Sequence, residues 1–197
     1  MQNGKQTRTA IASSWRAFSK MHDSIEAKEA EARILDFLAA LGIDVTLHKH
    51  QPVFTVKEAQ THTAHLPGLH VKNMFLKDKN AQLWLITCLD KRKIKIKDLE
   101  KKIGARKMSF GKPDLLWETL GVRPGAVTPL ALFADRARHR VKCVIDAALI
   151  DAPIVNCHPL HNAATIALSH AGLKKFFTAT GHDPIDVDFD VLEARAS

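Results

Sequence analysis

The chain has 197 residues, of which 46% are apolar and 25% charged, and this composition is typical of one globular domain of ordinary size. No stretch approaches the roughly 18 consecutive apolar residues that a membrane span requires, so the sequence predicts no membrane partner. The formal net charge is +8, and a polyanion is the partner that this charge favours if the basic residues are clustered.

The N-terminal residues 1–22 carry four basic residues, several Ser and Thr, and no acid. This composition fits either a transit peptide or a poorly ordered extension, and the sequence leaves both open. There is no apolar signal-peptide core, so we expect a cytoplasmic rather than a secreted protein. We therefore predict a poorly ordered extension at residues 1–23 and a single domain at residues 24–197.

The first predicted element is a helix that begins at residues 23–26. Asp23 is followed three residues later by Glu26, which is a capping-box pattern, and apolar residues then recur at helical spacing up to Leu41. Gly42 ends the run. The next elements are expected to be short: a strand near residues 45–49, a polar helix near 56–62 and a loop at 66–68.

Residues 70–88 predict a hairpin of two apolar strands joined by a polar turn at 77–80. Lys72 and Asn73 interrupt the first strand. Successive side chains of a strand point to opposite faces, so Lys72 and Asn73 cannot both lie on the surface if one face of the strand packs in the core. Two interpretations remain open: Lys72 points to solvent while Asn73 satisfies a backbone group, or the pair lines a functional site.

The positive charge is concentrated in residues 91–107, which hold nine basic residues against two acidic ones. This segment has a charge of +7, and the rest of the chain only +1. A solvated strand and helix surface is the ordinary alternative, but one concentrated patch favours a phosphate backbone as partner. The candidate residues for binding a phosphate backbone are Lys91, Arg92, Lys93, Lys95, Lys97, Lys101, Lys102, Arg106 and Lys107.

The second half of the chain predicts further short elements. They are helices at 97–103, at 113–120 between Pro113 and Gly121, and at 172–181, with strands at 126–133, 141–146, 153–157 and 185–189. Strands and helices alternate irregularly and include a hairpin. The predicted fold class is therefore α/β (α+β), a mixed and largely antiparallel β-sheet surrounded by helices.

Two loops are candidate sites beside Lys72-Asn73. The turn from Gly121 to Pro129 contains Pro124-Gly125, and such a turn can direct consecutive backbone N–H groups at an anion, although most Pro-Gly turns are only turns. His158 follows an apolar strand and precedes Pro159, which holds it extended. Whether His158 faces a cleft or is a hydrogen-bonded structural residue stays open.

Several chemistries find no support in the sequence. It contains no GxSxG elbow, no Walker-type phosphate loop, no HExxH and no zinc-type cluster among its 11 histidines, so we expect no metal and no cofactor. The three cysteines are odd in number and lack CxxC spacing, which favours buried thiols in a reducing compartment. Adjacency of Cys157 and His158 in sequence does not make them a nucleophile–base pair.

Taken together, "VKNMFLKDKNAQLWLIT", "KMSFGKPDLLWETLGVRPGAVTPLAL" and "NCHPLHNAATIALS" resemble, in order and spacing, the YbaK/ProX-type aminoacyl-tRNA editing domains. The resemblance runs from about residue 28 to 190 and is strongest to the free-standing Ala-tRNA(Pro) deacylases (ProXp-ala, or PrdX). It implies the mixed sheet surrounded by helices of that synthetase-associated domain family, and a deacylase that needs no metal.

The resemblance also assigns site residues. Lys72 matches the signature lysine and Asn73 its companion, and Gly125 completes the implied catalytic set. The implied substrate-binding residues are Gly121, Pro124, Ala126, His158, Asn162 and Thr165. Ala126 is a departure, because many relatives have Ser after Pro-Gly, and the run "PLALF" also differs from the commoner Gly-containing one.

The implied function is deacylation of mischarged Ala-tRNA(Pro) in trans, that is, an aminoacyl-tRNA deacylase of the carboxylic ester hydrolase class. Its partners would be tRNA(Pro) bearing a wrong amino acid and, transiently, prolyl-tRNA synthetase or an elongation factor. Two alternatives remain: a sibling deacylase for Cys- or Ser-charged tRNA, and a tRNA- or synthetase-binding module that has lost catalysis.

Overall fold

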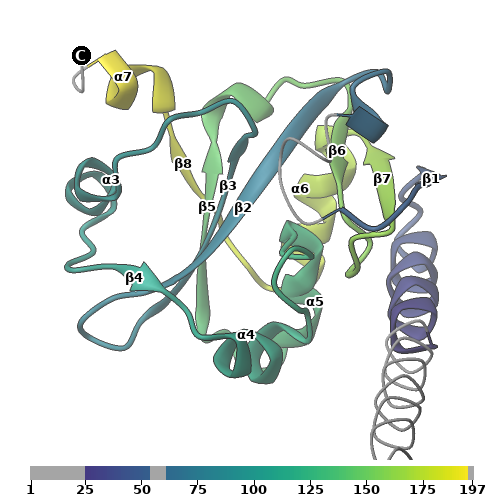
Figure 1. Ribbon diagram of the computed structural model, residues 1–197, viewed down its shortest axis with the longest axis horizontal. Coiled ribbons are helices and arrows are strands. Elements are labelled where there is room, and N and C mark those ends of the chain that lie inside the picture. Colours follow the sequence, from purple (N-terminus) through teal and green to yellow (C-terminus); the bar gives the residue numbers. More distant parts are fainter. Residues whose placement is uncertain (1–24, 54–60, 195–197) are drawn as a thin grey trace, which may run out of the picture.

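The computed structural model describes residues 25–53 and 61–194, and one eight-stranded sheet organises them (Figure 1). The strand order is β1-β7-β6-β2-β3-β5-β8, with the short β4 paired to β2 beside this path. The strands are β1 (Val45–Lys49), β2 (Leu69–Lys77), β3 (Leu83–Leu89), β4 (Ser109–Phe110), β5 (Val141–Asp146), β6 (Val155–Cys157), β7 (Ala164–Leu168) and β8 (Ile185–Val187).

The sheet is mixed. Strand β2 pairs antiparallel with β3 and β4, and β7 pairs antiparallel with β1 and β6. The pairs β2–β6, β3–β5 and β5–β8 are parallel. This confirms the predicted mixed sheet, and the hairpin at 70–88 is found as β2 and β3.

Helices cover both faces of the sheet. They are a helix at 25–40, α3 (Ile96–Ile103), α4 (Pro113–Leu120), α5 (Leu132–Asp135), α6 (His170–Ala179), α7 (Phe189–Ala194) and the 3-10 turns η1 (Pro129–Ala131) and η2 (Ala147–Leu149). Within the described ranges, no helix is long and apolar enough to cross a bilayer.

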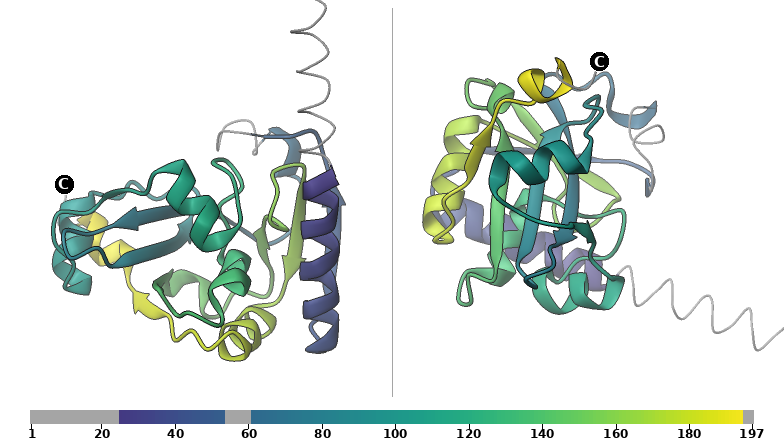
Figure 2. Two further views of the ribbon diagram at one scale, coloured as in Figure 1. Left: turned by 90° about the horizontal axis from the view of Figure 1, so that it is seen from below. Right: turned by 90° about the vertical axis from the view of Figure 1, so that its left-hand side faces the viewer.

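Strand β3, with the sequence LWLITCL, is buried along its whole length because it is packed on both faces. Leu83, Leu85 and Leu89 belong to a large cluster with the helix at 25–40, α4, α5 and α6. Trp84 and Ile86 belong to a smaller cluster with α3 and α7. The two views in Figure 2 show these helix groups on opposite sides of the central strands.

Two predicted elements differ from the structure, and one strand was missed. Residues 126–133 do not form a strand, because the Thr128 side chain accepts a hydrogen bond from the Leu130 amide and caps η1, which begins at Pro129. The last strand ends at Val187, since the Asp188 carboxylate caps α7. Strand β7 was not predicted.

The remaining elements lie close to their predicted positions. Strand β6 covers only 155–157 of the predicted 153–157, and α6 begins at residue 170 rather than 172 because Ser169 caps it through the amide of Gly172. The predicted helix at 56–62 falls mostly outside the described residues, as do the extension at 1–23 and the start of the capping box.

Candidate functional site

The three candidate segments adjoin β2: the turn contacts Asn73, and the strand that leads to His158 pairs with the first residues of β2. The side-chain amide of Asn73 donates a hydrogen bond to the Val127 carbonyl (2.9 Å), which ties β2 to the turn between α4 and η1. The hydroxyl of Thr128, in the same turn, lies near the thiol of Cys157 at the end of β6 and acts against the rise of its pKa. The turn is therefore held between β2 and the strand that leads to His158.

Both polar atoms of the Asn73 side chain have a partner within the protein. Its side-chain oxygen accepts a hydrogen bond from the Thr87 hydroxyl (2.8 Å), directly across the β2–β3 pair. Of the two interpretations that the sequence leaves open for Asn73, the contacts favour the structural one. Asn73 positions the turn, and a contact with a substrate would use the second N–H of its amide.

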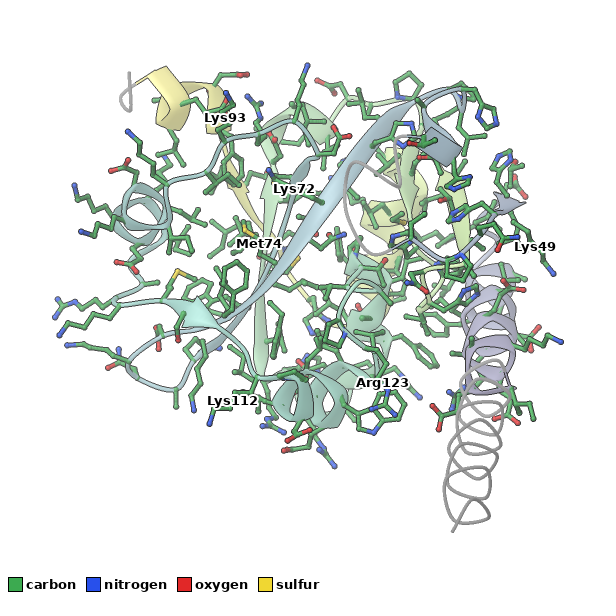
Figure 3. The ribbon with its side chains drawn as sticks, in the orientation of Figure 1. Lys49, Lys72, Met74, Lys93, Lys112 and Arg123 are labelled. Carbon is green, nitrogen blue, oxygen red and sulfur yellow. The ribbon has the colours of Figure 1, made fainter. Side chains whose placement is uncertain are left out.

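Lys72 points to the other face of β2. Its ammonium donates to the backbone carbonyl of Arg92, in the loop between β3 and α3, and the side chain is half-buried (Figure 3). Across the sheet it is paired with Cys88, which is buried. A half-exposed cation at the start of the basic segment is available to an incoming anion, whereas Asn73 is bound to the turn.

The cysteines are not nucleophiles at neutral pH. Burial raises the pKa of Cys88 to about 12, although the Lys72 ammonium acts in the opposite direction. Burial likewise raises the pKa of Cys143 and of Cys157 to about 12. All three are buried free thiols, as predicted, and the thiol of Cys157 stays protonated beside His158.

The turn itself is shaped by two glycines with positive φ. Gly121 (φ 64°) ends α4, and its N–H donates to the Trp117 carbonyl. Gly125 (φ 89°) makes the second bend, a conformation that costs strain in other residues. The Ala126 amide donates to the Arg123 carbonyl (3.0 Å), so it is already used within the turn.

Ala126 is 5% exposed and packs in the large core cluster. A Ser side chain at this position would be buried in the same way. The amide of residue 126 is already bonded to the Arg123 carbonyl and is therefore not available to an anion.

His158 is half-buried and held by one ring nitrogen. Its Nδ1 lies 3.0 Å from the Ala164 carbonyl, and because a carbonyl only accepts, Nδ1 carries the proton. Burial lowers the pKa of His158, while the Ala164 bond raises it and the neighbouring His50 lowers it further. The ring is therefore neutral at pH 7, with Nε2 as an acceptor.

Asn162 and Thr165 hold the segment that follows β1. The Asn162 side-chain amide donates to the Val53 carbonyl (2.7 Å), and the Thr165 hydroxyl bonds Nε2 of His50 (3.0 Å). The His50 and His158 rings lie 6.4 Å apart. The resemblance assigned Asn162 and Thr165 to the substrate, and the contacts found for their side chains hold His50 and Val53 in place.

Two residues that the sequence does not single out hydrogen-bond the candidate site residues: Thr87 bonds Asn73, and His50 bonds Thr165. Thr87 was missed because the hairpin turn spans residues 78–82 rather than the predicted 77–80, and this later turn sets the register that pairs Thr87 with Asn73. His50 had no local signal in the sequence, since its contact with Thr165 joins residues 115 positions apart.

Eight of the nine predicted tRNA-binding cations are exposed, on the loop before α3, on α3 and on the turn after it. Arg92 is the exception, and its assignment is corrected. It is 5% exposed, and its guanidinium binds Asp146, Asp190 and Glu193. Its backbone carbonyl accepts from Lys72, so the exposed cations begin next to the signature lysine.

No three His, Cys, Asp or Glu side chains lie together as metal ligands among residues 25–53 and 61–194.

A family model described as an aminoacyl-tRNA editing domain matches residues 50–176, which include all three segments of the site. The chain belongs to this family. The resemblance noted in the sequence is thereby confirmed at the family level.

Relatives of this editing domain match over most of their own length. A prolyl-tRNA synthetase associated domain-containing protein 1 from Bos taurus is 42% identical, with 82% of this chain and 96% of the relative covered. The prolyl-tRNA editing protein ProX of Acetoanaerobium sticklandii is 36% identical, with 78% and 94% covered.

Solved structures support the fold. A crystal structure of a candidate trans-editing enzyme for prolyl-tRNA synthetase has a TM-score of 0.60 at 18% identity, and the match covers 81% of this chain and 96% of that one. At this identity the likeness concerns the architecture alone, and it agrees with the mixed sheet surrounded by helices.

Proposed function

We propose that this protein is a trans-acting editing hydrolase that removes alanine from mischarged Ala-tRNA(Pro) in the cytoplasm, with tRNA(Pro) and transiently prolyl-tRNA synthetase or an elongation factor as partners. The observation that carries the proposal is the match to the prolyl-tRNA editing protein ProX over 94% of its length. The position of Lys72 beside a row of exposed cations supports it.

The need for such an enzyme follows from binding physics. A synthetase pocket that accepts proline cannot exclude the smaller alanine, because each missing methylene costs the wrong substrate only about 1–3 kcal/mol. A second site that is too small for proline but admits an alanyl ester removes the error.

The proposed reaction is ester hydrolysis. A water oxygen attacks the carbonyl carbon that links alanine to the terminal ribose, and the bond from that carbon to the ribose oxygen breaks. The ribose oxygen takes a proton, which leaves free alanine and uncharged tRNA. Lys72 supplies a cation for the terminal phosphate or ribose, and Gly125 an amide for the developing oxyanion.

The site supplies no evident general base. The thiols of Cys88 and Cys157 are protonated, and His158 has a backbone carbonyl rather than a carboxylate as partner. The Glu31 carboxylate instead bonds His161 (2.9 Å). The free hydroxyl of the substrate's own ribose is therefore the group that we propose positions the water.

Two other functions remain as competitors. A sibling enzyme would clear cysteine or serine from tRNA, through the same site with a different pocket size. A binding module without catalysis is motivated by Ala126, where no hydroxyl faces the turn. Relatives named for association with prolyl-tRNA synthetase keep a docking role open.

One panel separates these functions. Purified protein is incubated with proline tRNA charged with alanine, cysteine, serine or proline, and ester loss is followed at catalytic enzyme levels. Preferential loss of alanine is expected, and preferential loss of cysteine or serine would instead identify the sibling activity. No turnover of any ester, with retained binding in a filter assay, would show a binding module.

A further inference from the structure

Phe110, on β4, has an unusually open position. Its side chain is 66% exposed, more than the other large apolar side chains exposed on the described surface: Ile25, Trp117, Ile185 and Val191. Single exposed apolar residues are ordinary on protein surfaces. The exposure therefore becomes informative only through the residues around it.

The backbone at Phe110 is fixed. Phe110 pairs with Leu76 of β2, and the next amide, Gly111, donates to the Phe75 carbonyl (2.9 Å). A Cβ at Gly111 would lie 2.4 Å from the Phe75 ring, so only glycine allows this close approach. The exposed ring is thus carried by a strand that cannot easily move.

The segments next to β4, in the chain or in the sheet, carry exposed cations. The Lys79 amide donates to the Arg106 carbonyl (3.0 Å), which joins the hairpin tip to the turn before β4, and Lys77 is paired with Ser109. The five exposed cations are Lys77, Lys79, Arg106, Lys107 and Lys112.

These charges are not neutralised locally. None of the five forms an ion pair within the ranges that the structure describes. The Asp78 carboxylate between two of them is buried and accepts bonds from the amides of Asn80 and Gln82. Two acids lie close by: the exposed Asp114, in the first turn of α4, and the half-buried Glu100, whose carboxylate accepts a hydrogen bond from the Met108 amide (2.6 Å).

We propose that Phe110 is a stacking platform for an unpaired base of a bound RNA strand, with these five cations holding the phosphates beside it. An aromatic ring among cations is the composition of single-strand binding sites. A protein-binding surface would differ, because the centre of such interfaces is depleted in lysine. The inference rests on the proposed function, in that the RNA would be part of the tRNA.

The location agrees with the rest of the proposed RNA surface. Helix α3 and β4 lie on the same side of the molecule (Figures 1 and 2), and in Figure 3 Lys93 and Lys112 mark the two ends of this side. Exposed cations therefore continue from α3 to β4, and an RNA bound at Lys72 and along α3 would contact them as far as Phe110.

The test compares Phe110→Ala with Val191→Ala, which removes an apolar side chain that is 46% exposed on α7. The dissociation constant is measured for uncharged tRNA(Pro) and for a short oligouridine. Loss of one base stack should weaken binding by Phe110→Ala about 5- to 150-fold, and Phe110→Trp should retain it. Val191→Ala should bind both RNAs as tightly as wild type does. The melting temperatures of the variants should equal that of wild type.

Salt dependence provides a second readout. Phe110→Ala removes no phosphate contact and should leave the slope of log K against log salt unchanged, whereas Lys107→Ala should reduce it by about 1. Equal RNA binding by Phe110→Ala and wild type, or no binding by wild type, would overturn the platform. So would a loss of synthetase binding alone, which would mark a protein interface.

The outcomes are separable from those of the editing proposal, since uncharged RNA is the probe. If wild type deacylates Ala-tRNA(Pro) but Phe110→Ala binds RNA normally, only the platform is wrong. If no mischarged tRNA is deacylated while Phe110→Ala still loses RNA binding, the platform stands and the editing proposal fails.

Discussion

At the scale of single residues, Lys72 and Asn73 are neighbours with different tasks. Asn73 is bound on both sides within the protein, and Lys72 has one backbone partner and a half-exposed ammonium. Replacing Lys72 by Ala should therefore cost activity rather than stability. A lost charge-assisted hydrogen bond is worth about 1.5–3 kcal/mol, so alanyl ester hydrolysis should fall roughly 10- to 150-fold.

The control for Lys72 is Lys91→Ala, an exposed lysine at the start of the basic segment. Single-turnover deacylation and the melting temperature are measured for both variants. Lys72→Arg should keep part of the activity because it keeps the charge. Unchanged deacylation in Lys72→Ala would remove this lysine from the site.

His158 gives a pH prediction. Burial holds its folded-state pKa below the value of about 6.5 expected in the unfolded chain. As pH falls, the unfolded state takes up the proton first, so the stability contribution of His158 is full above about pH 6.5 and is lost below it. In urea unfolding, wild type should lose more stability between pH 7.5 and 5.5 than His158→Asn.

Burial also lowers the pKa of His170 and of His182, but both titrate in wild type and variant alike and cancel in the comparison. A stability advantage of wild type over His158→Asn that grows toward pH 5.5 would mean that the folded protein binds the proton. The neutral, Nδ1-protonated ring described above would then be wrong.

The same residue also tests the sieve. If His158 shapes the aminoacyl pocket, His158→Ala should enlarge it, so that larger aminoacyl esters are cleaved while alanine cleavage falls moderately. A general base behaves differently, since its loss costs about 10²–10⁴ in rate for every ester. Alanyl and prolyl ester hydrolysis measured side by side distinguish the two.

At the scale of elements, the loop between β3 and α3 depends on the C-terminal helix. Glu193 of α7 accepts from the Lys93 amide (2.5 Å) and binds the Arg92 guanidinium, which also binds the fully buried Asp146. Arg92→Ala would leave the Asp146 charge buried without its partner, which should destabilise the fold by about 3–5 kcal/mol.

Lys93→Ala is the matched control, because this side chain is exposed on the same loop. Urea unfolding should show a large loss for Arg92→Ala and almost none for Lys93→Ala. Equal stability of the two variants, with a flatter salt dependence of RNA binding in Arg92→Ala, would return Arg92 to the RNA surface.

How far the sequence predicts these elements depends on how local their causes are. The β2–β3 hairpin and α4 were predicted because alternation, Pro113 and Gly121 act within a few residues. Strand β7 was missed although one of its partners, β6, is close to it in the sequence. Its other partner, β1, lies near the opposite end of the described chain, and this long-range pairing leaves no local pattern in the sequence. Residues 126–133 have the apolar content of a strand, but the Thr128 side chain caps the 3-10 turn η1, so these residues form a turn instead.

The candidate site could be proposed from the sequence where motif residues form it, as for Lys72 and the Gly125 turn, and their roles stay predictions. The burial of Arg92 could not be predicted, since a buried and an exposed arginine look alike in a run of cations. Its carboxylate partners lie 54, 98 and 101 residues away, and only the folded sheet brings them together.

At the scale of the whole molecule, the charge is asymmetric, and the exposed cations of residues 91–107 should bind the tRNA body rather than take part in chemistry. Each phosphate neutralised adds about −0.9 to the slope of log affinity against log salt. Engaging three or four phosphates would make wild-type binding fall steeply with salt. Neutralising Lys91, Lys93 and Lys97 together should weaken binding and flatten this slope by about 2–3.

The control neutralises three exposed lysines elsewhere, Lys49, Lys174 and Lys175, and Figure 3 shows Lys49 at the opposite end of the molecule from Lys93. This variant has the same net charge but should retain the wild-type slope, which separates a located surface from a general effect of charge. Single-turnover deacylation at saturating enzyme should be nearly equal in all three proteins, because the proposed reaction takes place at Lys72 and the turn. A salt-independent wild-type affinity, or identical slopes in the two triple variants, would show that residues 91–107 do not bind the tRNA.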